Sequence, residues 1–305
     1  MSPRRALALS VLLLFAVRAG AHPGLHHDIA RVTEAIERAP NQADLYVERA
    51  YFERLDGRLE EALMDLDTAQ RLDPSNPRVA AERGMALSAR RDDVEAEREL
   101  SRFAEAGGTA PIFMERAAVR VRLGRKSEAL ADYAAAIRLR PDVEAFMARG
   151  ELQESMGDLD AAAAGYRDGL AATGGAVSIR LALVRVESVR NHPDAALALL
   201  DEELARARVK TDWYLRRAEV EEKAGRTSAA RADREKALAE ANRVIGTTPT
   251  GIHYLSRARA LFALGHTDEA RRDLDVALTK SPRFIEARQL LELLDAVDGG
   301  KGSKP

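Results

Sequence analysis

The sequence predicts an all-α fold, an α-solenoid of antiparallel helix pairs with a capping helix at each end. Charged residues make up 31% of the chain and aromatic residues only 5%, a balance typical of helical arrays. The second observation is an internal period, because alanines recur at intervals of 34, 33, 33, 34, 34 and 40 residues. These alanines are Ala62, Ala96, Ala129, Ala162, Ala196, Ala230 and Ala270.

The first 21 residues have the order expected of a secretory signal. Two arginines are followed by an apolar run from Ala6 to Val17 and by small residues that end at Ala21. The run is shorter than the roughly 20 residues that a membrane-spanning helix needs, so we expect cleavage after Ala21 and no transmembrane span afterwards. We therefore predict an exported protein, periplasmic or extracellular.

Residues 22–42 form the next predicted segment, which contains histidines and a capping helix. Ile29, Val32 and Ile36 stand at helical spacing before Pro40, as in the second helix of an incomplete repeat. Such a cap covers the apolar face that a terminal repeat exposes.

The histidines of this segment allow a second interpretation. After cleavage, the free amine and the imidazole of His22 could chelate copper or zinc together with His26 or His27, since nitrogen donors suit such metals. The alternative is that these histidines are a solvated polar segment before the cap. Both interpretations stay open at this point.

Seven repeats follow over residues 43–282, starting near 43, 77, 110, 143, 177, 211 and 251. Twelve residues before each periodic alanine stands a second column of mostly small residues, which would let two antiparallel helices approach closely. Between the two columns lies a turn column rich in glycine, the residue that favours the left-handed end of a helix. The turn column is Gly57, Arg91, Gly124, Gly157, Asn191, Gly225 and Gly265.

The repeat resembles the tetratricopeptide repeat family. The third repeat carries the family's spacing best, with Phe113, Arg116–Ala117, Ala129, Tyr133 and Pro141. The resemblance covers Ala43 to about Arg283. It implies a right-handed superhelix whose concave groove, lined by the first helix of each repeat, binds a protein or peptide.

Three features depart from the repeat or follow it. Arg180, Glu203 and Arg234 occupy core columns, either as long side chains that reach solvent or as a buried pair between Glu203 and Arg234. Six extra residues precede the seventh repeat and suggest a longer loop. Residues 283–298 are predicted to form a C-terminal solvating helix, and residues 299–305, rich in glycine, lysine and serine, a disordered tail.

Composition and motifs exclude several function classes. The 47 basic residues are balanced by 49 acidic ones, so no global field would gather nucleic acid, and we expect no nucleic-acid partner. The absence of cysteine excludes thiol catalysis and disulfides. No nucleophile motif, phosphate-binding loop or zinc spacing occurs, so we expect no enzyme and no cofactor.

The remaining prediction is a peptide-binding groove on the first helices of the repeats. Methionines on such a surface suit an adaptable apolar site, and the C-terminal part of the surface is charged. We predict an adaptor that binds a protein or peptide and associates peripherally with an envelope complex; ordinary helix packing and a structural assembly subunit are the alternatives. The candidate residues are Val47, Tyr51, Met85, Met114, Met147, Glu151, Arg185, Leu215 and Arg259.

Overall fold

The computed structural model describes residues 23–301, and all of its regular structure within that range is helical. The chain divides into two compact bodies, an N-terminal body whose described residues are 23–140 and a C-terminal body whose described residues are 141–301. The predicted all-α class is therefore confirmed. The N-terminal body contains α1 (Pro23–Arg38), α2 (Ala43–Leu55), α3 (Leu59–Leu72), α4 (Pro77–Arg90), α5 (Asp93–Glu105), α6 (Ala110–Arg122) and α7 (Lys126–Leu139). The C-terminal body contains α8 (Val143–Ser155), α9 (Leu159–Ala172), α10 (Val177–Val189), α11 (Pro193–Arg206), α12 (Thr211–Lys223), α13 (Thr227–Thr247), α14 (Gly251–Ala263), α15 (Thr267–Lys280) and α16 (Ile285–Lys301).

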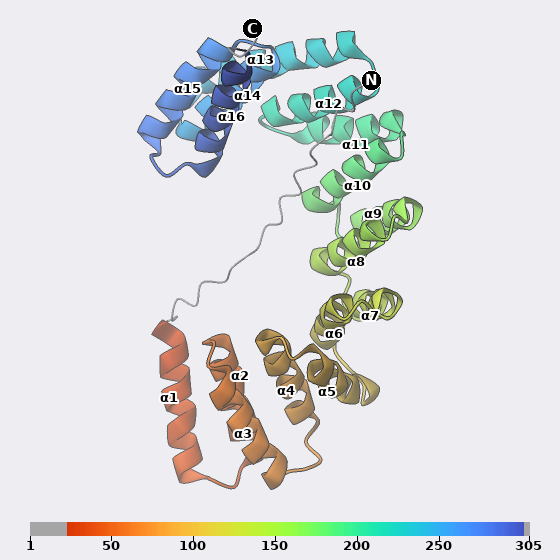
Figure 1. The fold of residues 1–305 in the computed structure, drawn as a ribbon, viewed down its shortest axis with the longest axis vertical. Helices are drawn as coiled ribbons and strands as arrows, with labels where there is room; N and C mark the ends of the chain where they lie inside the picture. The colour runs from red at the N-terminus through yellow and green to blue at the C-terminus, as the bar shows by residue number, and fades with distance from the viewer. Residues whose placement is uncertain (1–22, 302–305) are drawn as a thin grey trace. The chain divides into compact units, whose positions relative to one another are not determined.

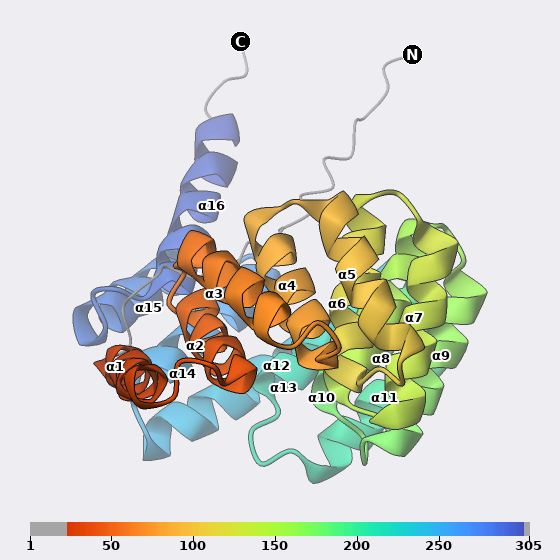
Figure 2. The ribbon, with the colours of Figure 1, turned by 90° about the horizontal axis from the view of Figure 1, so that it is seen from below.

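Within each body the helices pack as antiparallel pairs in chain order. In the N-terminal body α2 packs on α3, α4 on α5 and α6 on α7; Figures 1 and 2 both show α4 and α5 side by side. In the C-terminal body the pairs run from α8 with α9 to α14 with α15. First helices of some successive pairs also touch, α8 with α10 and α12 with α14 in the C-terminal body.

Small residues lie where the helices of a pair cross. All seven periodic alanines are completely buried. Gly150 on α8 shows how tight the crossing is, because a Cβ atom there would lie 2.3 Å from the ring of Tyr166 on α9. The small columns therefore let large core side chains fill the space beside the crossing.

The turn column ends the first helix of each pair in the left-handed region. Five glycines of the column have φ between 74° and 83°. Arg91 and Asn191 take the same conformation, with φ of 70° and 60°. Glycine adopts this conformation without the steric cost of a Cβ atom, which explains its predominance in the column.

Arginine–aspartate pairs hold the two helices of four repeats together. In each pair, an arginine of the first helix donates two hydrogen bonds to an aspartate 16 residues later on the second helix, at 2.6–2.9 Å. Each arginine also lies 5.4–5.9 Å from the centre of an aromatic ring of its own helix. The pairs are Arg49–Asp65, Arg116–Asp132, Arg217–Asp233 and Arg257–Asp273.

The charged core positions pair differently from the prediction. Arg180 is 4% exposed and its Nε lies 2.8 Å from Glu203 of the next helix. Arg234 bonds instead to Glu222 at 3.0 Å. The alternative of a pair between Glu203 and Arg234 is therefore wrong, because each residue has an oppositely charged partner within its own repeat.

The predicted loop before the seventh repeat is mostly helix. α13 has 21 residues and continues to Thr247, so most of the six extra residues lengthen this helix. Ala241 and Val244 are buried on this extension. Their burial gives the longer helix an apolar face and explains why it persists.

The end helices cover the terminal repeats of their bodies. α1 buries Val32 completely and packs on α2, while α16 buries Ala287 and Leu294 against α15. α16 continues through residues 299–301, part of the predicted tail. The predicted signal peptide, His22 and residues 302–305 lie outside the described residues. Over the range 23–301, no helix combines the length and apolar character that a membrane span requires.

Candidate functional site

The candidate residues of the N-terminal body have different surroundings. Val47 is 1% exposed and belongs to the core formed by α2 and α3, so it contributes to packing. Tyr51 is 40% exposed and lies under the guanidinium of Arg54. Met85 and Met114 are half-buried on α4 and α6. These four residues do not converge on one pocket among those resolved in this body, so they define a surface rather than a site.

The C-terminal body brings four of the candidates into two adjoining pockets. Met147 and Arg185 line the first pocket, and Leu215 and Arg259 line the second. Glu151 lies exposed on α8 outside both linings. We refer to the two pockets together as the α12 groove, because Arg216 and Glu219 of α12 line both.

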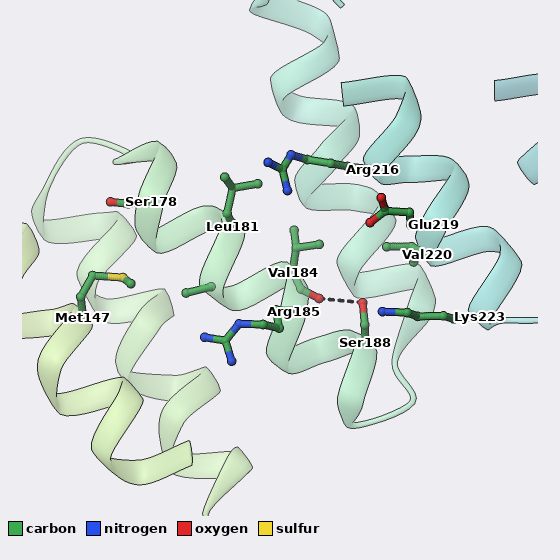
Figure 3. Close-up of a pocket in the computed structure, with 11 residues that line it drawn as sticks. Met147, Ser178, Leu181, Val184, Arg185, Ser188, Arg216, Glu219, Val220 and Lys223 are labelled. Carbon is green, nitrogen blue, oxygen red and sulfur yellow. Dashed lines mark hydrogen bonds between the residues drawn. The ribbon is translucent and has the colours of Figure 1, made fainter. Parts of the chain in front are cut away.

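The first pocket has a volume of about 370 Å³ and lies mainly between α10 and α12 (Figure 3). Its apolar lining comes from Leu181 and Val184 of α10 and Val220 of α12. Arg216 and Lys223 project from α12 toward α10 at opposite ends of this lining. The pocket therefore has an apolar floor with a cation at each end.

Arg185 forms the wall of the first pocket nearest α8, and its position is fixed. Its guanidinium donates two hydrogen bonds to Glu154 of α8, one of them at 2.9 Å. The buried Tyr166 hydroxyl donates to the same carboxylate at 2.7 Å. Burial alone would lower the pKa of Arg185, but the Glu154 contact raises it above its usual value. Arg185 is therefore already neutralised and leaves the floor of the pocket accessible.

The second pocket, of about 490 Å³, lies between α12 and α14. Leu215 and Phe262 give it apolar surface, and Asp212, Arg216, Glu219, Arg234 and Arg259 give it charge. Arg234 is paired with Glu222 on its own repeat. Within residues 23–301, neither Arg216 nor Arg259 has an ion-pair or hydrogen-bond partner, and both have access to solvent.

Sequence analysis missed part of this lining. Arg216 belongs to the charged C-terminal surface but was not assigned to the site, and Lys223 was not considered. A signal was present, because these two residues are seven positions apart and therefore share one side of α12. Their lack of partners depends on what α10, α13 and α14 place nearby, which the sequence does not show.

The candidate metal site is incomplete in the described part of the chain. His26 and His27 lie exposed on α1, and His26 Nδ1 is 3.9 Å from Asp56 Oδ2. No group of three metal-binding side chains occurs among residues 23–301. His22, on which the hypothesis depends, is outside that range.

Comparisons with known proteins agree with the architecture. A family model for the tetratricopeptide repeat matches residues 29–77 and 114–177. No curated protein matches the sequence. A solved structure of the C-terminal part of a repeat protein of this type from Cytophaga hutchinsonii is 13% identical, covers 80% of this chain and 98% of its own, and has a TM-score of 0.56.

Two further solved structures are similar at lower TM-scores. A tetratricopeptide repeat protein from Parabacteroides merdae is 21% identical, with 83% of this chain and 98% of that chain covered and a TM-score of 0.48. The tetratricopeptide protein YrrB, described as having an unusual peptide-binding site, is also 21% identical. That match covers 65% of this chain and 95% of YrrB, with a TM-score of 0.47.

Proposed function

Because the chain is a tetratricopeptide repeat protein, we propose that it is a non-enzymatic scaffold that binds a protein or peptide segment in the α12 groove. The observation that carries this proposal is the juxtaposition of apolar floor and unpaired cations in two adjoining pockets. Concave sites with mostly apolar linings and a few polar groups are the usual form of ligand sites.

The arrangement of the two pockets supports a peptide partner. They adjoin along α12, with about 370 and 490 Å³ each, so consecutive side chains of one segment could fill them in turn. No serine of the two linings is hydrogen-bonded to a carboxylate or a histidine within residues 23–301, and Ser188 donates instead to the backbone carbonyl of Val184. The groove is therefore suited to holding a partner rather than transforming it.

The wall of the groove is organised before a partner arrives. Tyr166 is completely buried, and through Glu154 it holds Arg185 at the edge of the first pocket. A wall that is already ordered reduces the entropy lost on binding, which raises affinity for a matching segment.

Site-specific photo-crosslinking tests this proposal. Because the sequence contains no cysteine, a crosslinker attaches only to the cysteine that a substitution introduces. We would attach a photo-crosslinker to Ser178→Cys, which lines the first pocket, and to the control Ser228→Cys, which is exposed on α13. In extract of the source cells, we expect a protein or peptide joined to Ser178→Cys only. The product should disappear when Leu181→Glu blocks the floor. Equal labelling from both positions, or labelling unaffected by Leu181→Glu, would contradict the proposal.

We also propose that the protein is exported and acts in the periplasm or outside the cell. The support is the order of basic, apolar and small residues over residues 1–21. Intact-mass measurement after cell fractionation tests it. We expect a chain that begins at His22 in the exported fraction, and a full-length chain confined to the cytoplasm would contradict export.

A further inference from the structure

The α12 groove contains three cations that the described structure leaves unpaired. Arg216 and Lys223 stand on α12 and Arg259 on α14, and no side chain within residues 23–301 forms an ion pair or hydrogen bond with any of them. Their helical neighbours behave differently, because Arg217 and Arg257 both donate two hydrogen bonds to aspartates. The groove side of α12 and α14 thus holds positive charge without a partner.

Two carboxylates also line the α12 groove and contribute to its net charge. Glu219 lies between Arg216 and Lys223 on α12, and Asp212 lies one turn before Arg216. Neither forms an ion pair with the three cations. The unpaired charges therefore sum to three positive and two negative. Arg216 and Lys223 flank the apolar floor of the first pocket, and Glu219 stands between them on α12 (Figure 3).

The spacing of the flanking cations gives the spacing of the groups they would bind. Arg216 and Lys223 are two helical turns apart, about 10 Å along the axis of α12. An extended peptide advances about 3.3 Å per residue, so carboxylates about three residues apart would reach both cations. The one or two residues between them would lie over Leu181, Val184 and Val220, which favours apolar side chains.

The apolar floor of the first pocket suits an extended segment. An extended strand points alternate side chains to one side, so they could pack on Leu181, Val184 and Val220.

We propose that the α12 groove binds an extended acidic peptide in which two carboxylates about three residues apart enclose apolar side chains. The two carboxylates pair with Arg216 and Lys223, and Arg259 receives a further acidic residue at the second pocket. This inference rests on the proposed function and adds the chemical class of the partner. Because the pairs lie at an open surface, their contribution weakens with increasing salt.

A selection experiment tests the partner class. A library of random short peptides is selected on the immobilised full chain, and the enriched sequences are measured for affinity by fluorescence anisotropy at low and high salt. The same measurements are made on the triple variant Arg216→Gln/Lys223→Gln/Arg259→Gln. Arg231→Gln is the matched control, because this arginine is 74% exposed on α13 outside both pockets.

The expected result is enrichment of peptides with paired carboxylates around apolar residues. Their affinity should fall about tenfold in the triple variant and be unchanged in Arg231→Gln. Enriched peptides without paired carboxylates, with affinities that survive the triple variant but are lost with Leu181→Glu, would overturn the acidic partner class and leave the proposed function standing. No enrichment over an unrelated immobilised protein would contradict the proposed function itself.

Discussion

The two adjacent arginines of α12 have opposite surroundings. Arg217 faces α13, donates two hydrogen bonds to Asp233 at 2.6–2.7 Å and also contacts Asp201. Arg216, one residue earlier, faces the groove, and the described residues offer it no partner. On one helix, therefore, the charge of Arg217 is paired within the repeat, whereas the charge of Arg216 is free to pair with a ligand.

This difference separates structural charge from functional charge. A buried ion pair contributes little relative to apolar packing, but removal of one partner leaves an uncompensated charge and is strongly destabilising. An exposed unpaired cation contributes almost nothing to folding. Substitutions at the two arginines should therefore affect different properties, stability at Arg217 and binding at Arg216.

The largest expected effect is that of Arg217→Ala. Asp233 is 3% exposed and would keep only Lys236, at 3.1 Å, as a charged partner. We expect the free energy of unfolding to fall by about 3 kcal/mol, measured by urea denaturation at neutral pH. A loss equal to that of Arg216→Ala would contradict the structural role of the pair.

Glu53 on α2 is a buried carboxyl group with few partners, and its effect on the stability of the fold should depend on pH. It is 4% exposed, its Oε2 has no hydrogen-bond partner, and Arg58 is 3.5 Å from Oε1. Burial, together with the nearby charge of Asp65, raises the pKa of Glu53 from 4.5 to about 7. The folded state thus binds a proton that the unfolded state releases near pH 4.5, so stability is highest below that pH and falls as the pH rises through 7.

Replacement of Glu53 by glutamine tests this pH dependence. Glu53→Gln should remove the fall in stability between pH 4.5 and 7 and leave the variant more stable than the parent chain above that range, by on the order of 2 kcal/mol. Thermal melts across this pH range measure it. Parallel profiles for the parent and the variant would contradict the assignment.

A smaller gain is expected where the arginine–aspartate pair is incomplete. Arg149 occupies the arginine column of α8, but Gly165 stands 16 residues later where four other repeats have aspartate, and Arg149 Nε is buried without a hydrogen-bond partner. A Cβ atom at Gly165 would lie 3.0 Å from Arg149 Nη2, the movable end of a flexible side chain.

Gly165→Asp should supply the missing partner of Arg149. We expect it to exceed the neutral control Gly165→Asn by about 1 kcal/mol in the free energy of unfolding, because only aspartate adds the charge-assisted pair. Urea denaturation of both variants gives the difference. Equal stabilities would show that Arg149 is adequately solvated as it stands.

The smallest expected effect on stability is that of Arg216→Ala. Its side chain is exposed and unpaired within the described range, so the free energy of unfolding should change by less than about 0.5 kcal/mol. The same variant should weaken peptide binding. A large loss of stability here would remove the distinction between the two sides of α12.

The fold was largely predictable from the sequence, because the periodic alanines and the turn column report backbone geometry directly. Every alanine of that column is buried, and even Arg91 and Asn191 adopt the positive φ of the glycine positions. The pairing of charges was less predictable. Arg234 bonds to Glu222 rather than Glu203, since the choice among nearby carboxylates depends on side-chain geometry.

The groove was predictable only in part. Met147, Arg185, Leu215 and Arg259 stand at the repeat positions that face it, whereas Val47 occupies an equivalent position and is core. Arg216 and Lys223 became candidates only when the structure showed the space between α10 and α12.

The most direct test of the central claim, that unpaired groove cations recognise carboxylates of a peptide, is a charge exchange. The affinity of an enriched acidic peptide is measured for the parent chain and for Arg216→Glu, and then again with one peptide carboxylate replaced by lysine. The account predicts that each change alone weakens binding by about tenfold and that the combination of the two restores much of the loss. If the loss of affinity from Arg216→Glu and the loss from the peptide substitution simply add at every carboxylate position tested, a direct contact between Arg216 and a peptide carboxylate is contradicted.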